Sequence, residues 1–418
     1  MRITRIERIV VDAGHTPTAG RHMRRGLADW ALSEVCKVTT DTGLVGWGET
    51  LPHYTWGVVT DAGVERALGA NPADLLWDDS LGAGLQQALF DLVGQSLGVP
   101  VHRLLGSAVR ARCPLAWWCY DMPPHDWAAE ARAGIEAGYT AFKLKARPWF
   151  DIIEQVEAVS AATPTHAKLD LDFNALLVDA GHATSVLTTL AGYPKVAIFE
   201  TPIPQTDIGG NRALRASVPR PIAMHFDSPP FLTAVKEGVC DGFVVSGGAA
   251  TCLHQGAQAA AANMPLWLQL VGTGITTAFA MHLGAVLPAA RWPAISCLNT
   301  YAYDLLTEPL PVEHGYVPVP DGPGLGVTVD EDLIHRLRRP DATPIELPRT
   351  IYSVRWADGR TAEYVDRDVY EPDFMAGNQP VFERGVTLTT SEDDGSVDFD
   401  NRFRAIEAAS CLVGASGA

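Results

Sequence analysis

Four short apolar runs that end in charged residues recur at nearly even spacing through the middle of the chain. The runs are AFKLKA, LDLDFN, IFETP and PIAMHFD, at residues 141–146, 169–174, 198–202 and 221–227. Their charged residues Lys145, Asp172, Glu200 and Asp227 follow one another at intervals of 27, 28 and 27 residues. A strand, a turn, a helix and a second turn occupy about that length. The spacing therefore predicts parallel strands whose ends bring these groups to one rim, where a parallel barrel builds its site.

The same alternation extends to both sides of these runs. Apolar runs lie at residues 114–120, 140–145, 167–172, 196–200, 221–225, 242–246, 265–270 and 294–298. Amphipathic or alanine-rich segments such as WAAEARAGIEAG and CLHQGAQAAAANM separate most of them. Strands that alternate with helices predict a (β/α) barrel, and we assign the barrel with its closing segment to residues 111–343. The last alternation is less regular, which leaves the strand count at seven or eight.

Different patterns flank the barrel region. Residues 1–110 indicate an α+β unit, because an alternating strand and a hairpin at 33–49 precede helices with a 3.6-residue apolar period. Two polar loops, at 13–30 and 51–57, interrupt this unit. Residues 344–418 alternate again, in TIYSVRW, TAEYV and GVTLTT, and predict a β-rich extension that covers an edge or makes a subunit contact.

Composition narrows the class of protein. The chain has 418 residues, of which 47% are hydrophobic and 19% charged, as in a soluble globular enzyme with a substantial core. A formal net charge of −17 without a basic cluster argues against nucleic acid as a partner. No apolar run is long enough to predict a membrane span, and the charged N-terminal strand does not resemble a signal peptide. The seven cysteines form no CxxC pair and predict reduced thiols, so we expect a cytoplasmic protein.

Several motifs along the chain carry a family resemblance. They are GLVGWGE, GQSLGVPVHRLLG, the KLK pair, DFN, ETP and the closing PDGPGLGV, within residues 1–334. In this order and spacing they resemble the enolase superfamily, specifically its mandelate racemase and muconate lactonising enzyme branch. The resemblance implies an α/β fold in which an α+β capping domain closes over a modified TIM barrel of the (β/α)7β type. It also implies a homo-oligomer that removes the proton beside the carboxylate of a small substrate, with Mg²⁺, or Mn²⁺ in its place, stabilising the enediolate.

Lys143 and Lys145 are the candidate catalytic cations. They lie two residues apart on one predicted strand, so both side chains point to the same face. Two ammonium groups this close lower one another's pKa, which suits a lysine to act as a base. The family pattern implies that Lys145 is the base and that Lys143 positions the carboxylate and tunes Lys145. The alternative is a pair of surface lysines on an edge strand.

Asp172 and Glu200 provide the hard oxygen ligands that Mg²⁺ prefers. By resemblance they match the first two metal positions of the family, and Asn174 matches an adjacent amide. The third position departs from the family's acidic pair, because His225 stands in that register and Asp227 follows two residues later. Three interpretations stay open. In the first, Asp227 is the third ligand, and His225 is an acid, a ligand or a substrate contact. In the second, His225 is the third ligand, and the site admits Mn²⁺ or Zn²⁺. In the third, the metal site has been lost.

The opposite side of the expected barrel lacks a second base. The sixth strand ends at Ser246 without a lysine, Gln269 stands about where the family has a histidine, and Gly272 replaces a glutamate. A two-base racemase needs a proton donor on each face, so the sequence favours a one-base reaction. We expect a metal-dependent lyase of the acid-sugar dehydratase type, with Lys145 as the base and His225 or a capping-loop histidine as the acid. The alternatives are an epimerase, racemase or cycloisomerase of the same branch, and a binding protein that has lost catalysis.

Further residues are candidates for substrate contact. The two polar loops lie where the family's capping loops close over substrate, and Trp118 shares one face of the first barrel strand with Tyr120. The predicted substrate-binding residues are His22, Arg24, His53, Tyr54, Trp118, Asn174 and Gln269, with Arg25 and Trp56 in the same loops. For the aromatic residues, burial in the core is the alternative interpretation.

Overall fold

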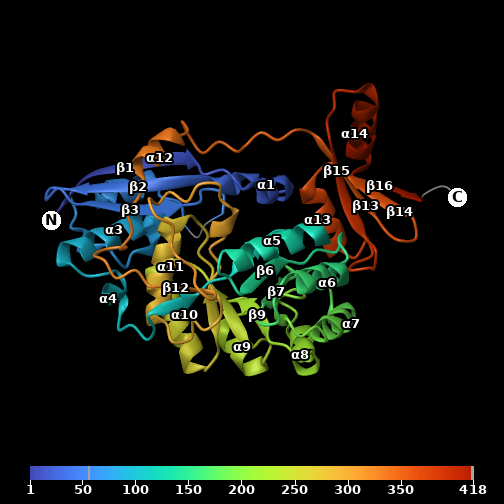
Figure 1. Ribbon diagram of the computed structural model, residues 1–418, viewed down its shortest axis with the longest axis horizontal. Coiled ribbons are helices and arrows are strands. Elements are labelled where there is room, and N and C mark those ends of the chain that lie inside the picture. Colours follow the sequence, from blue (N-terminus) through green and yellow to red (C-terminus); the bar gives the residue numbers. More distant parts are fainter. Residues whose placement is uncertain (55–56, 416–418) are drawn as a thin grey trace.

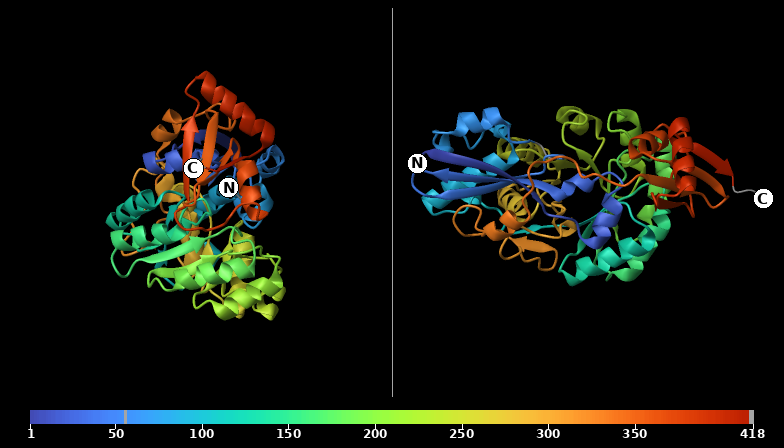
Figure 2. Two further views of the ribbon diagram at one scale, coloured as in Figure 1. Left: turned by 90° about the vertical axis from the view of Figure 1, so that its right-hand side faces the viewer. Right: turned by 90° about the horizontal axis from the view of Figure 1, so that it is seen from above.

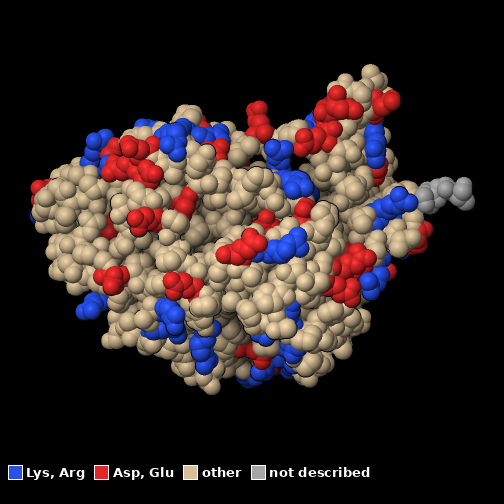
Figure 3. Space-filling model, in the orientation of Figure 1, with Lys and Arg blue, Asp and Glu red and all other residues tan. Residues whose placement is uncertain are grey.

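The protein has three parts, which follow one another along its longest axis (Figure 1). The computed structural model describes residues 1–54 and 57–415. An N-terminal sheet with helices lies at one end, a parallel barrel occupies the middle, and the C-terminal segment forms a lobe at the other end. On the face drawn in Figure 3, basic side chains are interspersed with acidic ones. Within the described ranges, no helix combines the length and apolar character that crossing a membrane requires.

The N-terminal part, here called the cap, is an antiparallel sheet covered by helices. Its strands are β1 (Ile3–Asp12), β2 (Leu32–Thr40) and β3 (Val45–Thr50), in that order. Its helices and 3-10 turns are α1 (Pro17–Met23), η1 (Ala28–Ala31), α2 (Asp61–Ala67), η2 (Pro72–Asp74), η3 (Asp79–Leu81), α3 (Ala83–Leu97) and α4 (His102–Leu105). Helix α3 packs closely on β3, because a Cβ at Gly48 would overlap the carbonyl oxygen of Gly84. The glycines of the GLVGWGE motif therefore set how the sheet meets its main helix.

Seven parallel strands form the barrel, and neighbours in the chain are neighbours in the sheet. They are β5 (Trp117–Cys119), β6 (Ala141–Lys145), β7 (Lys168–Asp172), β8 (Val196–Glu200), β9 (Ile222–His225), β10 (Gly242–Val245) and β11 (Leu266–Leu268). The helices that follow them are α5 (Pro124–Glu136), α6 (Ile152–Ala162), α7 (Ala180–Ala191), α8 (Ile208–Ser217), α9 (Phe231–Glu237), α10 (Ala249–Ala261) and α11 (Gly274–Val286). Asp151, Asp179 and Asp207 cap α6, α7 and α8, so the turns after the strands end at fixed points.

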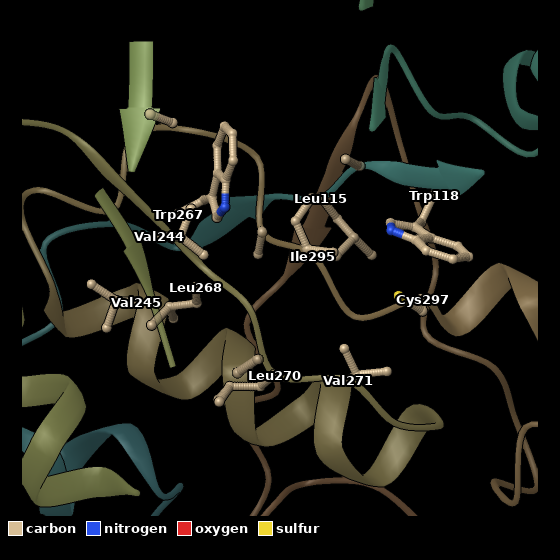
Figure 4. Close-up of a cluster of buried hydrophobic side chains, with 14 of the residues drawn as sticks. Leu115, Trp118, Val244, Val245, Trp267, Leu268, Leu270, Val271, Ile295 and Cys297 are labelled. Carbon is tan, nitrogen blue, oxygen red and sulfur yellow. The ribbon is translucent and has the colours of Figure 1, made fainter. Parts of the chain in front are cut away.

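A short extended segment at residues 290–295 closes the barrel between β11 and β5. Ile295 bridges to Gln269 beside β11, and Ala294 bridges to Leu115 just before β5. Figure 4 shows the buried apolar side chains around this closure. The eighth predicted strand is thus reduced to isolated bridges and leads into the turn η4 (Leu298–Thr300). Smaller elements complete the region: β4 (Arg112–Pro114), β12 (Tyr316–Pro318) and α12 (Glu331–Arg336). The predicted (β/α)7β barrel with an N-terminal cap is confirmed.

The C-terminal lobe, residues 350–415, is a four-stranded antiparallel sheet with two helices. In sheet order its strands are β15 (Thr387–Glu392), β13 (Thr350–Arg355), β14 (Arg360–Tyr364) and β16 (Leu412–Ala415), and its helices are α13 (Arg367–Met375) and α14 (Val397–Ala409). The lobe packs on the loop after β6, where Trp149 meets Tyr370 and Phe374 edge-on at ring-centroid distances of 4.9 and 5.5 Å. Figure 2 shows the lobe at the end of the molecule opposite the N-terminus. The predicted β-rich extension is confirmed, and helix α13 joins it to the barrel.

Candidate active site

Four ionisable side chains meet at the ends of β6, β7 and β8. In the parallel register Lys145 pairs with Asp172, and Asp172 pairs with Glu200, so these residues lie side by side. The Nζ atom of Lys145 lies 2.6 Å from Oδ2 of Asp172. Nζ of Lys143 lies 3.2 Å from the same oxygen and also contacts the Glu200 carboxylate. The side chains of Lys143, Asp172 and Glu200 are at most 1% exposed, so they form the buried end of the site.

Mutual ion pairing sets the protonation of this cluster. Burial lowers the pKa of Lys143, but Asp172 and Glu200 outweigh it and raise that pKa above its usual value. Burial also lowers the pKa of Lys145; Asp172 opposes this, Lys143 and Arg147 reinforce it, and the net shift is downward. Burial alone would raise the pKa of Asp172, yet the three neighbouring cations lower it overall. Lys145 is therefore the lysine of the pair that gives up its proton more easily.

A cavity of about 240 Å³ opens beside this cluster. It has a charged side of Lys145, Arg147, Asn174 and His225, a neutral side of Gln269, Val271, Ile295 and Cys297, and an aromatic wall of Trp30, Tyr54, Trp118 and Tyr120. Within the aromatic wall, the ring centroid of Trp30 lies 4.2 Å from that of Tyr54 and 5.8 Å from that of Trp118. Arg367 and Glu371 of the C-terminal lobe also line the cavity. The arrangement suits a small acid with an apolar or partly polar body.

The surroundings of Glu200 show how far the site fits a metal. Among the described residues, no three His, Cys, Asp or Glu side chains are grouped as a metal site. However, Oε1 of Glu200 is buried without a hydrogen-bond partner in the described part of the chain, and it lies 3.4 Å from Nε2 of His225. Adjacent ligands of one cation lie roughly 3.0–3.5 Å apart when each bond is about 2.1 Å long. Glu200 and His225 therefore have the spacing of two ligands of one divalent cation, and the neighbouring Asp172 is the candidate for a third. Two carboxylates and one imidazole would favour Mn²⁺ or Zn²⁺ over Mg²⁺.

Asp227 lies apart from this group. Its backbone has a φ of 60°, and its exposed side chain accepts a hydrogen bond of 3.2 Å from the amide of Phe231, at the start of α9. The left-handed turn thus directs the carboxylate to the next helix, whereas the half-buried His225 faces the cavity. The structure does not bring Asp227 to Asp172 and Glu200, so the geometry gives no support to Asp227 as the third ligand.

Four of the predicted substrate-binding residues line the cavity: Tyr54, Trp118, Asn174 and Gln269. The amide of Gln269 donates a hydrogen bond of 2.6 Å to the hydroxyl of Tyr54. Oδ1 of Asn174 accepts a hydrogen bond of 3.0 Å from Nζ of Lys145, which fixes the position of the lysine at the cavity. The capping loop and the barrel strands therefore share this site.

The other three predicted substrate residues do not line the cavity. Each is held by a partner distant in the sequence: His22 by Asp126 at 2.6 Å, Arg24 by Glu392 at 3.2 Å, and His53 by the carbonyl oxygen of Ala342 at 2.7 Å. The first loop, expected to be irregular, forms α1 and η1 and buries His22 and Arg25. Trp56 lies outside the described residues.

Some residues line the cavity without having been predicted. Arg147 had a detectable signal, because the sequence KLKAR places a cation at every second position from Lys143 onward. Trp30, Arg367 and Glu371 had none. Trp30 is the last residue of the first polar loop, and the other two belong to a segment whose packing partners lie far away along the chain.

Comparison with known proteins extends these observations. Residues 126–333 match the family model described as enolase C-terminal domain-like. A D-galactonate dehydratase of Ralstonia nicotianae is 29% identical over 374 residues, which span 78% of this chain and 95% of that protein. Muconate cycloisomerase 1-2 of Acinetobacter lwoffii is 30% identical over 270 residues, which span 62% of this chain and 69% of that protein.

Solved structures share the fold over most of the chain. A mandelate racemase/muconate lactonizing family protein from Azoarcus sp. EbN1 superposes with a TM-score of 0.65 at 26% identity, over 83% of this chain and 98% of that one. These matches agree with the capped barrel. They support an enzyme of the lyase or isomerase type. The chain belongs to the enolase superfamily, in its mandelate racemase and muconate lactonising enzyme branch.

Proposed function

We propose that this protein removes the proton α to a substrate carboxylate with Lys145 and then expels a β-substituent, as a lyase does. The observation that carries the proposal is the position of Lys145, the one lysine among the described residues that lines the cavity. Its pKa is lowered by burial and by the neighbouring Lys143 and Arg147, and a base works best when its pKa approaches the working pH. Because the neutral side of the cavity carries no lysine or histidine among the described residues, a one-base reaction fits best.

The proton and electron movements can be written for a substrate with a hydroxyl on both its α- and β-carbons. Nζ of Lys145 accepts the α-proton, and the electrons of the broken C–H bond form the enediolate. Lys143 holds a permanent positive charge at the carboxylate end. The C–O bond at the β-carbon then breaks, and the hydroxyl leaves as water once it is protonated. The remaining enol becomes a 2-keto-3-deoxy acid when its β-carbon takes up a proton and its α-hydroxyl loses one.

Two groups beside the cavity assist this reaction. A divalent cation, Mg²⁺ or Mn²⁺, held by Asp172, Glu200 and His225, would supply positive charge for the enediolate. The acid that protonates the leaving hydroxyl is Tyr54, or His225 where that side chain does not hold the cation; both line the cavity. Because the Tyr54 hydroxyl accepts its hydrogen bond from Gln269, its own proton is free to be donated.

An acid sugar is the substrate class that we propose for this lyase. The D-galactonate dehydratases among the relatives act on such an acid by name, at 27–29% identity. Tyr54, Asn174 and Gln269 provide polar groups that can bind substrate hydroxyls in the cavity. His22, Arg24 and His53 contribute nothing to this argument, because their side chains are held elsewhere.

A cycloisomerase is the second candidate. One observation favours it: the aromatic wall, together with Val271 and Ile295, gives the cavity a large apolar surface. A substrate with an unsaturated or aromatic body would bury that surface better than a sugar acid would. The relative named muconate cycloisomerase belongs to this reaction class.

Proton NMR in D₂O separates these possibilities. The protein, with Mg²⁺ or Mn²⁺ added, is incubated with D-galactonate, other sugar acids and unsaturated carboxylic acids. We expect loss of the α-proton signal and formation of a 2-keto-3-deoxy product, with neither in the Lys145→Met variant. An isomerised or cyclised product would favour the second candidate. Tight binding of an acid without any exchange of its α-proton would contradict the proposed chemistry and favour a binding protein.

A further inference from the structure

Arg147 is a buried cation beside the cavity, and it forms no ion pair with a carboxylate of the described residues. It is 2% exposed, and its hydrogen bonds all go to neutral groups: the carbonyl oxygens of Ala146 and Asp172 at 2.9 and 3.1 Å, and Oδ1 of Asn174 at 2.7 Å. Its Nε is buried and has no hydrogen-bond partner in the described part of the chain. A charge taken out of water costs several kcal/mol unless an opposite charge offsets it. A negative charge next to Arg147 would therefore be electrostatically favourable.

A second guanidinium reaches the same cavity from the C-terminal lobe. Arg367 lies at the start of α13, with its side chain 20% exposed and its CZ atom 5.8 Å from the ring centroid of Tyr120. Its Nη2 is 2.5 Å from the Glu371 carboxylate, while its Nε is buried and unpartnered in the described ranges. Gly26 of the cap makes space for it, because a Cβ there would overlap the Arg367 side chain. The cap and the lobe thus fix Arg367 together at the cavity.

The cations around the cavity other than Arg147 each have a carboxylate partner. Lys143 and Lys145 are offset by Asp172 and Glu200. Arg25, also buried close to Tyr120, is offset by Asp121 at 3.3 Å. Arg367 is offset by Glu371, which leaves Arg147 as the one of these cations without a carboxylate at ion-pairing distance among the described residues. A divalent cation at Asp172 and Glu200 would add further positive charge on the same side of the cavity.

We propose that Arg147 and Arg367 bind a second carboxylate of the substrate, so that the protein acts on a small dicarboxylic acid. This inference rests on the proposed function for the position of the reactive carboxylate, at Lys143. It narrows the acid-sugar class to acids with a carboxylate at each end. The planar fork of a guanidinium matches a carboxylate, and two such forks that line one cavity of about 240 Å³ suit a compact anionic group. The C-terminal lobe thereby determines specificity for the substrate.

Isothermal titration calorimetry with pairs of acids of equal chain length tests the proposal. The probes are butyrate against succinate, valerate against glutarate and hexanoate against adipate, with 3-phosphonopropionate as a check on the anion type. We expect at least one dicarboxylate to bind about tenfold or more tightly than its monocarboxylate partner, a difference of about 1.4 kcal/mol. In both Arg147→Gln and Arg367→Gln this ratio should fall to about one, and in Arg367→Gln the monocarboxylate should bind as before. Arg404→Gln is the matched control, because Arg404 is exposed on α14 of the same lobe and pairs only with Asp400, at 3.0 Å.

The outcomes separate this inference from the proposed function. The inference would be overturned if both members of every pair bind equally to the unmodified protein. Equal weakening of both members of a pair in Arg367→Gln would also overturn it, and so would a clear preference for the phosphonate. If Arg367→Gln melts at a much lower temperature, Arg367→Lys replaces it and should retain only part of the preference. A dicarboxylate preference without any α-proton exchange would leave the inference standing and refute the lyase. Exchange on acids with one carboxylate, unchanged in Arg367→Gln and accompanied by equal binding within every pair, would do the reverse.

Discussion

The two sides of the cavity differ in the charges they carry. The ends of β6, β7 and β8 bring two lysines and two carboxylates together in a buried network. The facing side, after β11 and at the closing segment, presents Gln269, Val271, Ile295 and Cys297, none of which is charged. A lysine is therefore available for proton transfer on only one face of the substrate. This asymmetry is why we favour a one-base lyase over a two-base racemase.

Steric and electrostatic effects both exclude a glutamate from position 272 on the neutral side of the cavity. A Cβ at Gly272 would lie 2.7 Å from the Thr276 side chain and 2.8 Å from Oε2 of Glu49. Glu49 comes from the cap, is 1% exposed, and accepts a hydrogen bond of 2.9 Å from the amide of Thr273. The glutamate expected after the seventh strand has no room here, and a second carboxylate next to Glu49 would be repelled. The space is thus occupied by a carboxylate that secures the cap to the barrel.

Removing the base from the charged side should have the largest effect. Lys145→Met is expected to lower the rate of α-proton exchange about 10²- to 10⁴-fold, the usual contribution of a positioned general base. The measurement is proton NMR in D₂O with the acid that reacts best. The matched change on the neutral side is Gln269→Leu, which removes one neutral hydrogen bond and should alter the rate less than about tenfold. Similar losses in both variants would contradict the asymmetry.

Lys143 should matter for stability as well as for catalysis. Lys143→Met leaves Asp172 and Glu200 buried without their main counter-charge, so the free energy of unfolding should fall by about 3–5 kcal/mol. Urea unfolding followed by circular dichroism measures this. Lys168→Met, at the exposed start of β7, is the control and should change stability by less than about 0.5 kcal/mol. An equally small effect of Lys143→Met would mean that the ion pairs are not maintained in solution.

The charged side of the site could be predicted from sequence because it depends on strand periodicity. Lys143 and Lys145 share a face through alternation along β6, and Asp172 and Glu200 follow at the length of one βα unit. Each of these positions is set by local geometry that repeats around the barrel. The same logic applied to the next residue in register would have added Arg147. The barrel, the cap and the β-rich extension follow from the same patterns.

The loop residues could not be predicted in this way, because their side chains are positioned by distant partners. His22 and Arg24 lie in a polar segment, yet one is held by Asp126 of α5 and the other by Glu392 of the C-terminal lobe. Asp227 follows His225 closely, but a left-handed turn directs it to α9. Arg367 reaches the cavity only because the lobe packs on the barrel rim. None of these contacts leaves a pattern in a single sequence.

As the pH falls, the protein should lose stability through His282, near the neutral side of the cavity, before it loses stability through Asp172, on the charged side. His282, on α11 after β11, is fully buried; burial lowers its pKa to about 4, and the carbonyl oxygen of Leu325, which accepts its Nε2–H, only partly opposes this. The unfolded histidine takes up a proton near pH 6.5, whereas the folded one stays neutral, so stability is lost as pH falls from about 6.5 to about 4. Over this pH range, His282 is expected to lower the free energy of unfolding by about 3 kcal/mol. The pKa of Asp172 is lowered instead, so its contribution is lost only below about pH 4.

The His282 effect is measured as a difference between variants. Urea unfolding at pH 7, 5.5 and 4.5 is compared for the unmodified protein and His282→Gln, with the exposed His335→Gln as the control. His282→Gln should lower stability at pH 7 through its lost hydrogen bonds, but its stability should decline less on acidification. Parallel declines in all three proteins would show that His282 already accepts a proton in the fold.

The smallest effect concerns the third ligand at the charged side. His225→Asp restores a carboxylate beside Oε1 of Glu200, and Mg²⁺ prefers oxygen to imidazole nitrogen. We expect the dissociation constant of Mg²⁺ to fall about tenfold, about 1.4 kcal/mol, while that of Mn²⁺ changes less, as measured by calorimetry without substrate. Asp227→Asn is the matched control and should leave both constants unchanged, because that carboxylate caps α9. If Asp227→Asn instead weakens Mg²⁺ binding and His225→Asp does not strengthen it, the loop rearranges around the cation and Asp227 is the ligand after all. The charged side of the cavity would then obtain its third metal ligand from a residue whose side chain lies apart from it in the structure.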